Sequence, residues 1–293
     1  MMHKLIITIL LSTFLLVAPA YAENSFLYSK PIQTDNSPGY KFVVLDKEVY
    51  AHSNQLQDIR IFDETDEEVP YFLDSIRDAA TSKEKESFIQ SSEEAPFVIT
   101  QVRNDTVITI EVNHLFAFRL ELNTNDMFER NYALYGLNGE TKRYLLEGRL
   151  ANLPLDPSLP IKKDIVWSDT NPVDQLQLVI HNRDDKPINL KSVRISYYLN
   201  KLIFKDLGNT HYRLAYGNNA INSPHYDIMD YKTTVKKETL IPATLGAEVS
   251  TPPKTQLPES PTNYKLLFNL TISALALLLI IGIGLSLRKK NPK

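Results

Sequence analysis

A long uncharged segment near the C-terminus constrains this chain more than any other feature of its sequence. Leu266–Leu287 carries no charged residue over 22 positions, and four of the last six residues, 288–293, are basic. At 1.5 Å per residue, a helix of this length spans the ~30 Å hydrocarbon core of a bilayer. Basic residues beside such a span favour the cytoplasmic side. The sequence therefore predicts a transmembrane helix at 265–287 that contacts the lipid bilayer, and a cytoplasmic basic tail at 288–293.

The N-terminus has the features of a signal peptide. Lys4 supplies positive charge, Leu5–Val17 is an apolar stretch of 13 residues, and Ala20 and Ala22 form an A-x-A cleavage site. Such a stretch is short for a membrane span, so we expect cleavage after residue 22 rather than an uncleaved anchor. The two ends together predict a single-pass type I protein of a bacterial inner (cytoplasmic) membrane, with its body in the periplasm. A Gram-positive surface is the alternative, but no LPxTG-like motif precedes the final helix.

Composition excludes several classes of chemistry. The chain contains no cysteine, which excludes thiol catalysis and Cys-ligated zinc. Its net charge is -3 without clustered cations outside the tail, so nucleic acid is not an expected partner. No G-x-G-x-x-G and no P-loop pattern occurs among its 9 glycines, and no cofactor is expected.

Strand patterns dominate the predicted exported body. In four segments apolar residues alternate with polar ones, which is typical of strands with one buried face. These segments are Thr106–Val112, Phe118–Asn123, Leu176–His181 and Val193–Leu199. Asn138-Gly139 predicts a type I′ hairpin, and 182–187 (NRDDKP) predicts another turn. Spaced strands with turn signals and little helix predict an all-β fold of sandwich modules.

The predicted organisation has two modules and a linker. We expect an N-terminal β-sandwich module at 23–113 and a second β-sandwich module, of jelly-roll type, at 114–235. Residues 236–264 follow as a Pro-rich linker, because five prolines fall between Pro242 and Pro261. Such a segment favours an extended conformation and would hold the β modules away from the bilayer.

Several segments resemble an uncharacterised family of bacterial envelope proteins. The segment Tyr40–Leu73 contains L-x-D-I-R-I-F-D followed by E-V-P-Y-x-L, and it resembles the start of that family. Asn131–Gly136, Leu176–Pro187 and Tyr212–Asp227 are similar to later parts of it. The resemblance implies a signal peptide, a β-rich exported region and one C-terminal transmembrane helix. It implies no catalytic residue.

The second module also resembles galactose-binding-like jelly rolls. The resemblance lies in the F-R-L-E-L strand at 118–122, in Leu176–Ile180 and in the closing strand Val193–Tyr197. It implies that loops at one end of the sandwich bind sugars or other small ligands. Likeness of fold does not by itself carry function across.

Four residues are candidates for binding a ligand. Sugar sites combine aromatic platforms with hydrogen-bonding side chains, and Trp167, Tyr216, Asn218 and Arg183 lie near predicted loops or strand ends. Tyr135 and Tyr144 have similar positions. The alternative is structural, because tyrosine and tryptophan also cap sandwich cores.

Catalytic and metal sites are not predicted. None of the five histidines after residue 22 has metal-ligand spacing, and Asp169, Asp174, Asp184 and Asp185 lie in predicted loops without a calcium-binding pattern. Glycan hydrolysis needs two opposed carboxylates. Glu111, Glu121, Glu140 and Glu147 are candidates by type alone, and a solvated strand face is the simpler explanation.

These features lead to one main hypothesis and two alternatives. The main hypothesis is a non-catalytic, membrane-anchored envelope protein whose β-sandwich modules bind a glycan or an envelope protein partner. The alternatives are a carbohydrate-active hydrolase with a strand-borne carboxylate pair, and a structural subunit of a membrane complex. The sequence indicates neither the identity of the ligand nor the oligomeric state.

Overall fold

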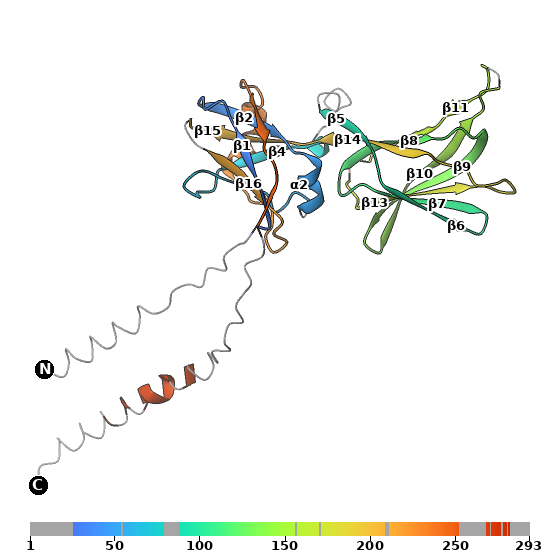
Figure 1. Cartoon of the computed structure of the whole chain (residues 1–293). Coiled ribbons are helices and arrows are strands. Elements are labelled where there is room, and N and C mark those ends of the chain that lie inside the picture. The colour runs from blue at the N-terminus through green and yellow to red at the C-terminus, as the bar shows by residue number, and fades with distance from the viewer. Residues whose placement is uncertain are drawn as a thin grey trace, which may run out of the picture. The chain divides into compact units, whose positions relative to one another are not determined.

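A computed structural model describes most of the chain between residues 26 and 251. The described residues are 26–53, 55–78, 88–155, 157–169, 171–208 and 211–251, together with 268–269, 271–276, 278–279 and 281 near the C-terminus. The chain divides into two compact units between Pro252 and Pro253. The first unit is built mostly of strands (Figure 1), so the predicted β-rich fold is confirmed.

An eight-stranded sheet combines strands from two separate parts of the chain. We call it the split sheet, because half of its strands come from residues 28–74 and half from residues 201–250. Its order is β3-β16-β1-β17-β2-β15-β4, and β18 also pairs with β1. β17 and β2 pair in parallel. The strands are β1 (Tyr28–Gln33), β2 (Gly39–Val44), β3 (Arg60–Phe62), β4 (Tyr71–Asp74), β15 (Lys201–Asp206), β16 (Tyr212–Tyr216), β17 (Ile241–Leu245) and β18 (Val249–Ser250).

The residues between these two parts form two further sheets, which we call together the central segment. One sheet has six strands in the order β11-β10-β9-β13-β7-β6, and the other has four in the order β12-β8-β14-β5. All of their pairs are antiparallel. The strands are β5 (Ile89–Glu94), β6 (Phe97–Val102), β7 (Asp105–Glu111), β8 (Phe116–Asn123), β9 (Phe128–Asn138), β10 (Thr141–Asn152), β11 (Ile161–Lys162), β12 (Asp164–Val166), β13 (Gln175–His181) and β14 (Ser192–Leu199).

Alternation along the strands builds the core of the central segment. Leu176, Leu178 and Ile180 of β13 are fully buried, while the residues between them are partly exposed. Successive side chains of a strand point to opposite faces, so this pattern requires one face to be covered. Leu120 of β8 and Val193 of β14, in the other sheet, belong to the same buried cluster. The two sheets of the central segment form two layers (Figure 1).

The predicted hairpin forms, but its turn differs in type. Asn138 pairs with Thr141, so Gly139 and Glu140 are the two turn residues between β9 and β10. Gly139 has φ +54°, whereas Glu140 is not among the residues with positive φ. A type I′ turn needs positive φ at both positions. The pairing therefore moves the turn one residue past Asn138-Gly139.

A short helix between β2 and β3 of the split sheet contacts the central segment. α2 (Lys47–His52) begins at Asp46, whose side chain accepts a hydrogen bond from the backbone N–H of Val49. Tyr50 of α2 is fully buried, and its hydroxyl accepts a hydrogen bond from the backbone N–H of Asn200 at 2.7 Å. The ring of Tyr50 also contacts the edge of Phe116, with centroids 6.1 Å apart. Asn200 lies where the chain leaves the central segment, and Phe116 begins β8, so Tyr50 anchors this end of the central segment to α2.

Short helical turns complete the described fold. They are η2 (Ile76–Asp78), η3 (Asp227–Tyr231) and α4 (Lys232–Val235). Val235 packs with Phe72 and Ile203 in a second buried cluster. Because Phe72 and Ile203 are paired residues of β4 and β15, the η3–α4 segment covers one face of the split sheet.

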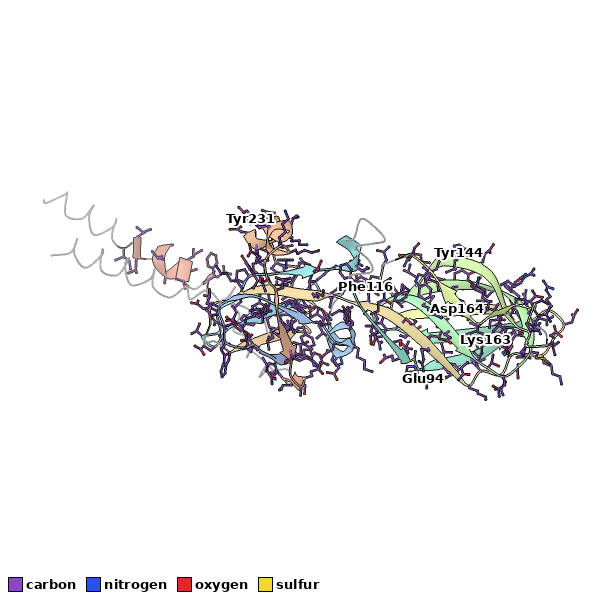
Figure 2. All side chains as sticks on the ribbon, turned by 90° about the horizontal axis from the view of Figure 1, so that it is seen from above. Glu94, Phe116, Tyr144, Lys163, Asp164 and Tyr231 are labelled. Carbon is purple, nitrogen blue, oxygen red and sulfur yellow. The ribbon has the colours of Figure 1, made fainter. Side chains whose placement is uncertain are left out.

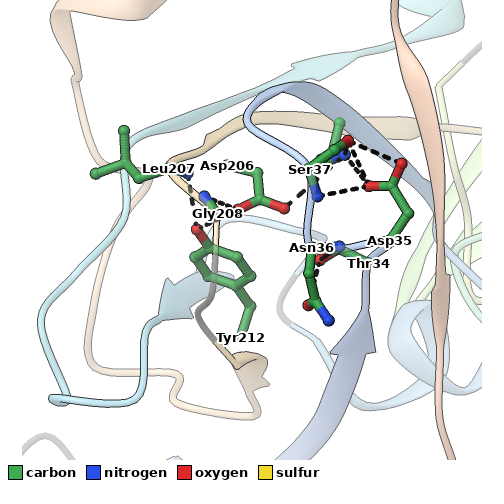
Figure 3. A network of polar contacts seen from close by, with 9 residues as sticks. Thr34, Asp35, Asn36, Ser37, Asp206, Leu207, Gly208 and Tyr212 are labelled. Carbon is green, nitrogen blue, oxygen red and sulfur yellow. Dashed lines mark hydrogen bonds and ion pairs between the residues drawn. The ribbon is translucent and has the colours of Figure 1, made fainter.

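A polar network holds two turns of the split sheet together (Figure 3). Lys41 of β2 is fully buried, and its ammonium donates to Asp35 and, at 2.9 Å, to Ser37, both in the β1–β2 turn. Asp206, also buried, lies 4.0 Å from the same ammonium. Its carboxylate accepts hydrogen bonds from the backbone N–H of Gly208 and from the hydroxyl of Tyr212. A buried charge must be compensated in this way to be tolerated.

Strand pairs cross the module boundary that was expected between residues 113 and 114. β7 lies before that boundary and pairs with β13 after it. β1 likewise pairs with β16, and β2 pairs with β15. Periodicity identifies a strand but not its partner, and here the partners are more than a hundred residues apart in the split sheet.

The described residues correct the expected Pro-rich linker and leave the other C-terminal predictions untested. Residues 241–250, expected in the Pro-rich linker at 236–264, contain β17 and β18, which pair with β1 and β2 of the split sheet. Within the described part of the chain, no helix is both long enough and apolar enough to cross a membrane. The predicted signal peptide at 1–22, half of the positions in Leu266–Leu287 and the tail at 288–293 lie outside the described residues.

Candidate functional site

The structure separates the four predicted ligand-binding residues into different places. Tyr216 and Asn218 lie at the end of β16 in the split sheet, whereas Trp167 and Arg183 belong to the central segment. Trp167 follows β12, is partly buried against the core, and donates its backbone N–H to Phe118. Arg183 is exposed in the β13–β14 turn, with φ +58°. These residues do not form one site.

Tyr216 is part of the packing of the split sheet. Its side chain is fully buried, and its hydroxyl donates to Glu248 at 2.6 Å. Burial is the main reason that the pKa of Tyr216 lies above its usual range, and this hydrogen bond raises the pKa further. Glu248 also contacts Nδ1 of His52 at 2.9 Å, and Tyr28 stacks on His52 with centroids 4.1 Å apart. The tyrosine therefore has a structural role, because it holds the segment before β18 against the sheet.

Asn218 is held by a buried carboxylate. Asp58, fully buried, accepts hydrogen bonds from the backbone N–H groups of Gly217 at 2.6 Å and Asn218 at 2.8 Å. It also accepts a hydrogen bond from the hydroxyl of Ser53. The side chain of Asn218 accepts from the backbone N–H of Ala220. This arrangement fixes the turn after β16 and leaves Asn218 only slightly accessible.

A hollow lies at one loop end of the central segment, next to Arg183. We call it the loop-end hollow; its volume is about 570 Å³. It opens between the β8–β9 connection and the β13–β14 turn. The lining residues are Asp126, Met127, Phe128, Arg130, Asp184, Asp185, Lys186, Pro187 and Ile188. Its size lies within the range of about 300–1,000 Å³ typical of small-ligand sites.

Hydrogen bonds between the two loops fix the shape of the hollow. Asp126 accepts the backbone N–H of Asn189 at 2.7 Å, and its carbonyl accepts the side-chain amide of Asn152 at 2.7 Å. The hydroxyl of Thr124 donates to the carbonyl of Asn189 at 2.8 Å. Three bonds thus bind the β8–β9 connection to the strand ends beside it. A site whose backbone is fixed in this way loses less conformational entropy when a ligand binds.

The charged groups of the hollow are only partly paired with one another. Arg130 forms an ion pair with Asp185 at 2.9 Å. Its Nε is buried and has no hydrogen-bond partner within the described chain, and the same holds for Oδ1 of Asn182 in the neighbouring turn. Asp184 and Lys186 are exposed, and neither side chain is bonded to another described residue. The hollow therefore offers both donors and acceptors to a ligand.

The arrangement does not resemble a metal centre. Among the residues that the structure describes, no three His, Asp or Glu side chains converge in a way that could hold a metal ion. Asp169 pairs with Arg143, and Asp174 lies 2.5 Å from Nε2 of His114. These two carboxylates lie at connections other than the loops that line the hollow, and they have protein partners.

The carboxylates considered for hydrolysis are spread over exposed surfaces. Glu111, Glu121, Glu140 and Glu147 are all exposed, and none lines the loop-end hollow. Glu121 lines a smaller depression of about 320 Å³ with Glu94 and Lys163, both labelled in Figure 2. Glu94 and Glu121 are the register partners of Arg194 on the two neighbouring strands. Two strand spacings separate their backbones by about 10 Å. Both side chains are exposed, whereas the general acid of a glycosidase typically lies in a buried, apolar environment.

Comparison with protein-family models, with curated proteins and with solved structures finds no match. The resemblance to an envelope family therefore stays a prediction.

Sequence patterns missed most of the loop-end hollow. Of its lining residues, sequence patterns single out only Asp184 and Asp185, as candidate calcium ligands, and Arg183 lies beside the hollow. The turn that the sequence predicts at 182–187 forms one side of the hollow. The other half, at Asp126–Arg130, has no local signal, because only sheet pairing brings it opposite the turn.

Proposed function

We propose that this chain is a membrane-anchored, non-catalytic envelope protein that binds a glycan in the loop-end hollow. The single observation that carries the proposal is a fixed hollow with uncommitted donors and acceptors beside apolar side chains. In the finer organisation proposed with it, the split sheet and the central segment belong to β-sandwich modules, the second of jelly-roll type. In that type of fold, loops at one end of the sandwich hold the ligand.

The chemistry of the hollow suits a polyhydroxylated ligand. Carboxylates such as Asp184 accept hydrogen bonds from hydroxyl groups, while Lys186 and the guanidinium of Arg130 donate to hydroxyl and ring oxygens. Met127, 58% exposed, and Pro187 offer apolar surface for the C–H faces of a sugar ring. Opposite charges line the same hollow, so a ligand need not be strongly charged.

The proposed location depends on the two chain ends. The uncharged segment Leu266–Leu287, followed by basic residues, supports a single span with the body outside the cytoplasm. The signal-like residues 1–22 support export of the same body. On this basis the relevant ligands are periplasmic polysaccharides, and the β body would reach them from the inner membrane.

The test is binding of envelope glycans by the full chain in detergent. We expect saturable binding of soluble peptidoglycan fragments or lipopolysaccharide oligosaccharides in isothermal titration calorimetry. Lys186→Ala and Asp184→Ala should each weaken it by about tenfold or more, because each removes a charge-assisted hydrogen bond.

Lys237→Ala and Asp230→Ala are matched controls, since both side chains are exposed, lie outside the central segment and are not bonded to another described residue. The proposal would be contradicted if the control variants weakened binding as much as the variants in the hollow. It would also be contradicted if neither glycan class bound.

A further inference from the structure

A second cavity, more apolar than the first, lies against the split sheet. Its volume is about 480 Å³, and it opens beside Tyr40 of β2 and Lys205 of β15, which pair with each other. The η3–α4 segment forms another wall. Two large apolar side chains at its edge are exposed, Leu207 at 74% and Tyr231, labelled in Figure 2, at 62%. Exposed apolar surface next to a cavity is typical of an interaction site.

The remaining wall, the β3–β4 connection, is acidic. It reads Asp63-Glu64-Thr65-Asp66-Glu67-Glu68. Three of its carboxylates, Asp63, Glu67 and Glu68, line the cavity against one ammonium, Lys205. Glu68 forms an ion pair with Nε of Arg60 at 3.1 Å. The carboxylate of Asp63 accepts hydrogen bonds from the backbone N–H groups of Thr65 and Glu67 in its own turn.

Glu67 remains available for a ligand. It is exposed, and its side chain bonds to no other described residue. Glu64, also exposed, continues the negative surface beyond the cavity. A ligand complementary to this surface is therefore apolar where it enters the cavity and cationic along the loop beside it.

We propose that this cavity binds an extended peptide segment of a partner protein, in which a large apolar side chain lies next to Lys or Arg. The apolar side chain enters between Leu207 and Tyr231, and the cation pairs with Glu67. Because the acidic surface extends past the cavity to Glu64, it matches a chain with more than one cation better than a compact ligand. The same carboxylates repel anionic lipid headgroups.

The test uses the full chain in detergent and two fluorescent hexapeptides. In one, Phe and Leu alternate with Lys; in the other, Glu replaces each Lys. We expect saturable binding of the Lys peptide by fluorescence anisotropy, weakened by added salt, and no saturable binding of the Glu peptide. Tyr231→Ser and Glu67→Lys should each weaken binding about tenfold or more.

Matched controls are Tyr144→Ser, in which Tyr144 is 54% exposed on β10, and Glu140→Lys in the β9–β10 turn; both should bind as the unaltered chain does. The proposal is overturned if neither peptide binds saturably, if both bind equally, or if the cavity variants and the controls behave alike. Lys186→Ala in the loop-end hollow should leave peptide binding unchanged, so failure of the glycan proposal and failure of this one are separate results.

Discussion

Single residues at the end of β16 show how closely the split sheet is packed. Gly217 has φ +85°, and a Cβ atom at this position would lie 2.6 Å from Cδ2 of Tyr28. Gly139 also has positive φ, at +54°, but a Cβ there would meet nothing within 4 Å. The two glycines thus share a left-handed conformation and differ in the space around them.

This difference predicts unequal effects of alanine at the two positions. Gly217→Ala should lower the free energy of unfolding by about 2–4 kcal/mol, since left-handed strain and overpacking add. Gly139→Ala should lower it by about 1–2 kcal/mol from strain alone. Urea unfolding followed by tyrosine fluorescence measures both. Equal losses in the free energy of unfolding would show that the close contact with Tyr28 does not affect stability.

At the scale of elements, buried charges connect turns that are far apart in sequence. The network around Lys41 binds the β1–β2 turn to the end of β15 (Figure 3). Hydrogen bonds from Lys41 and Ser37 lower the pKa of Asp35 from 3.8 to about 2. Because folded Asp35 binds a proton more weakly than unfolded Asp35, it stabilises the fold above the unfolded pKa. That contribution is lost as the pH falls towards 2.

Asp35→Asn should therefore change the pH dependence of stability between pH 4 and pH 2. The variant should be less stable than the unaltered chain at pH 7, and its stability should fall less steeply on acidification, because the titrating carboxylate is gone. Urea midpoints at pH 7, 4, 3 and 2 measure this. Asp230→Asn, an exposed carboxylate that bonds to no other described side chain, is the control and should follow the unaltered chain. If the stability of the Asp35→Asn variant fell as steeply as that of the unaltered chain, the pH dependence would not come from Asp35.

At the scale of the whole molecule, the chain closes the split sheet only after the central segment is complete. β1–β4 precede that segment and β15–β18 follow it. The two loop-derived cavities lie on different parts of this arrangement, one at the end of the central segment and one on the split sheet. Tyr50 of α2 links the parts through Asn200 and Phe116.

This connectivity predicts which fragments fold. A fragment of residues 88–199 contains every strand of the two central sheets, so we expect a strand-type circular dichroism spectrum and cooperative thermal unfolding. A fragment of residues 23–113 lacks the partners of β1 and β2 and one of the two partners of β7, so it should remain unfolded. The fragment 114–235 should fail in the same way. Cooperative unfolding of 23–113 would contradict the pairing.

The strands and their buried faces could be predicted from the amino-acid sequence, because alternation is a local property. Leu176, Leu178 and Ile180 are buried as their spacing predicts, and the β9–β10 hairpin forms where Asn138-Gly139 indicated a turn. Long-range packing was needed to show which strands pair, that β17 and β18 join the sheet despite Pro242, and that Tyr216 is a packing residue. It also decided where Asp126 meets the 182–187 turn. Strand pairing and cavity formation depend on contacts between residues far apart in sequence, and no local pattern specifies those.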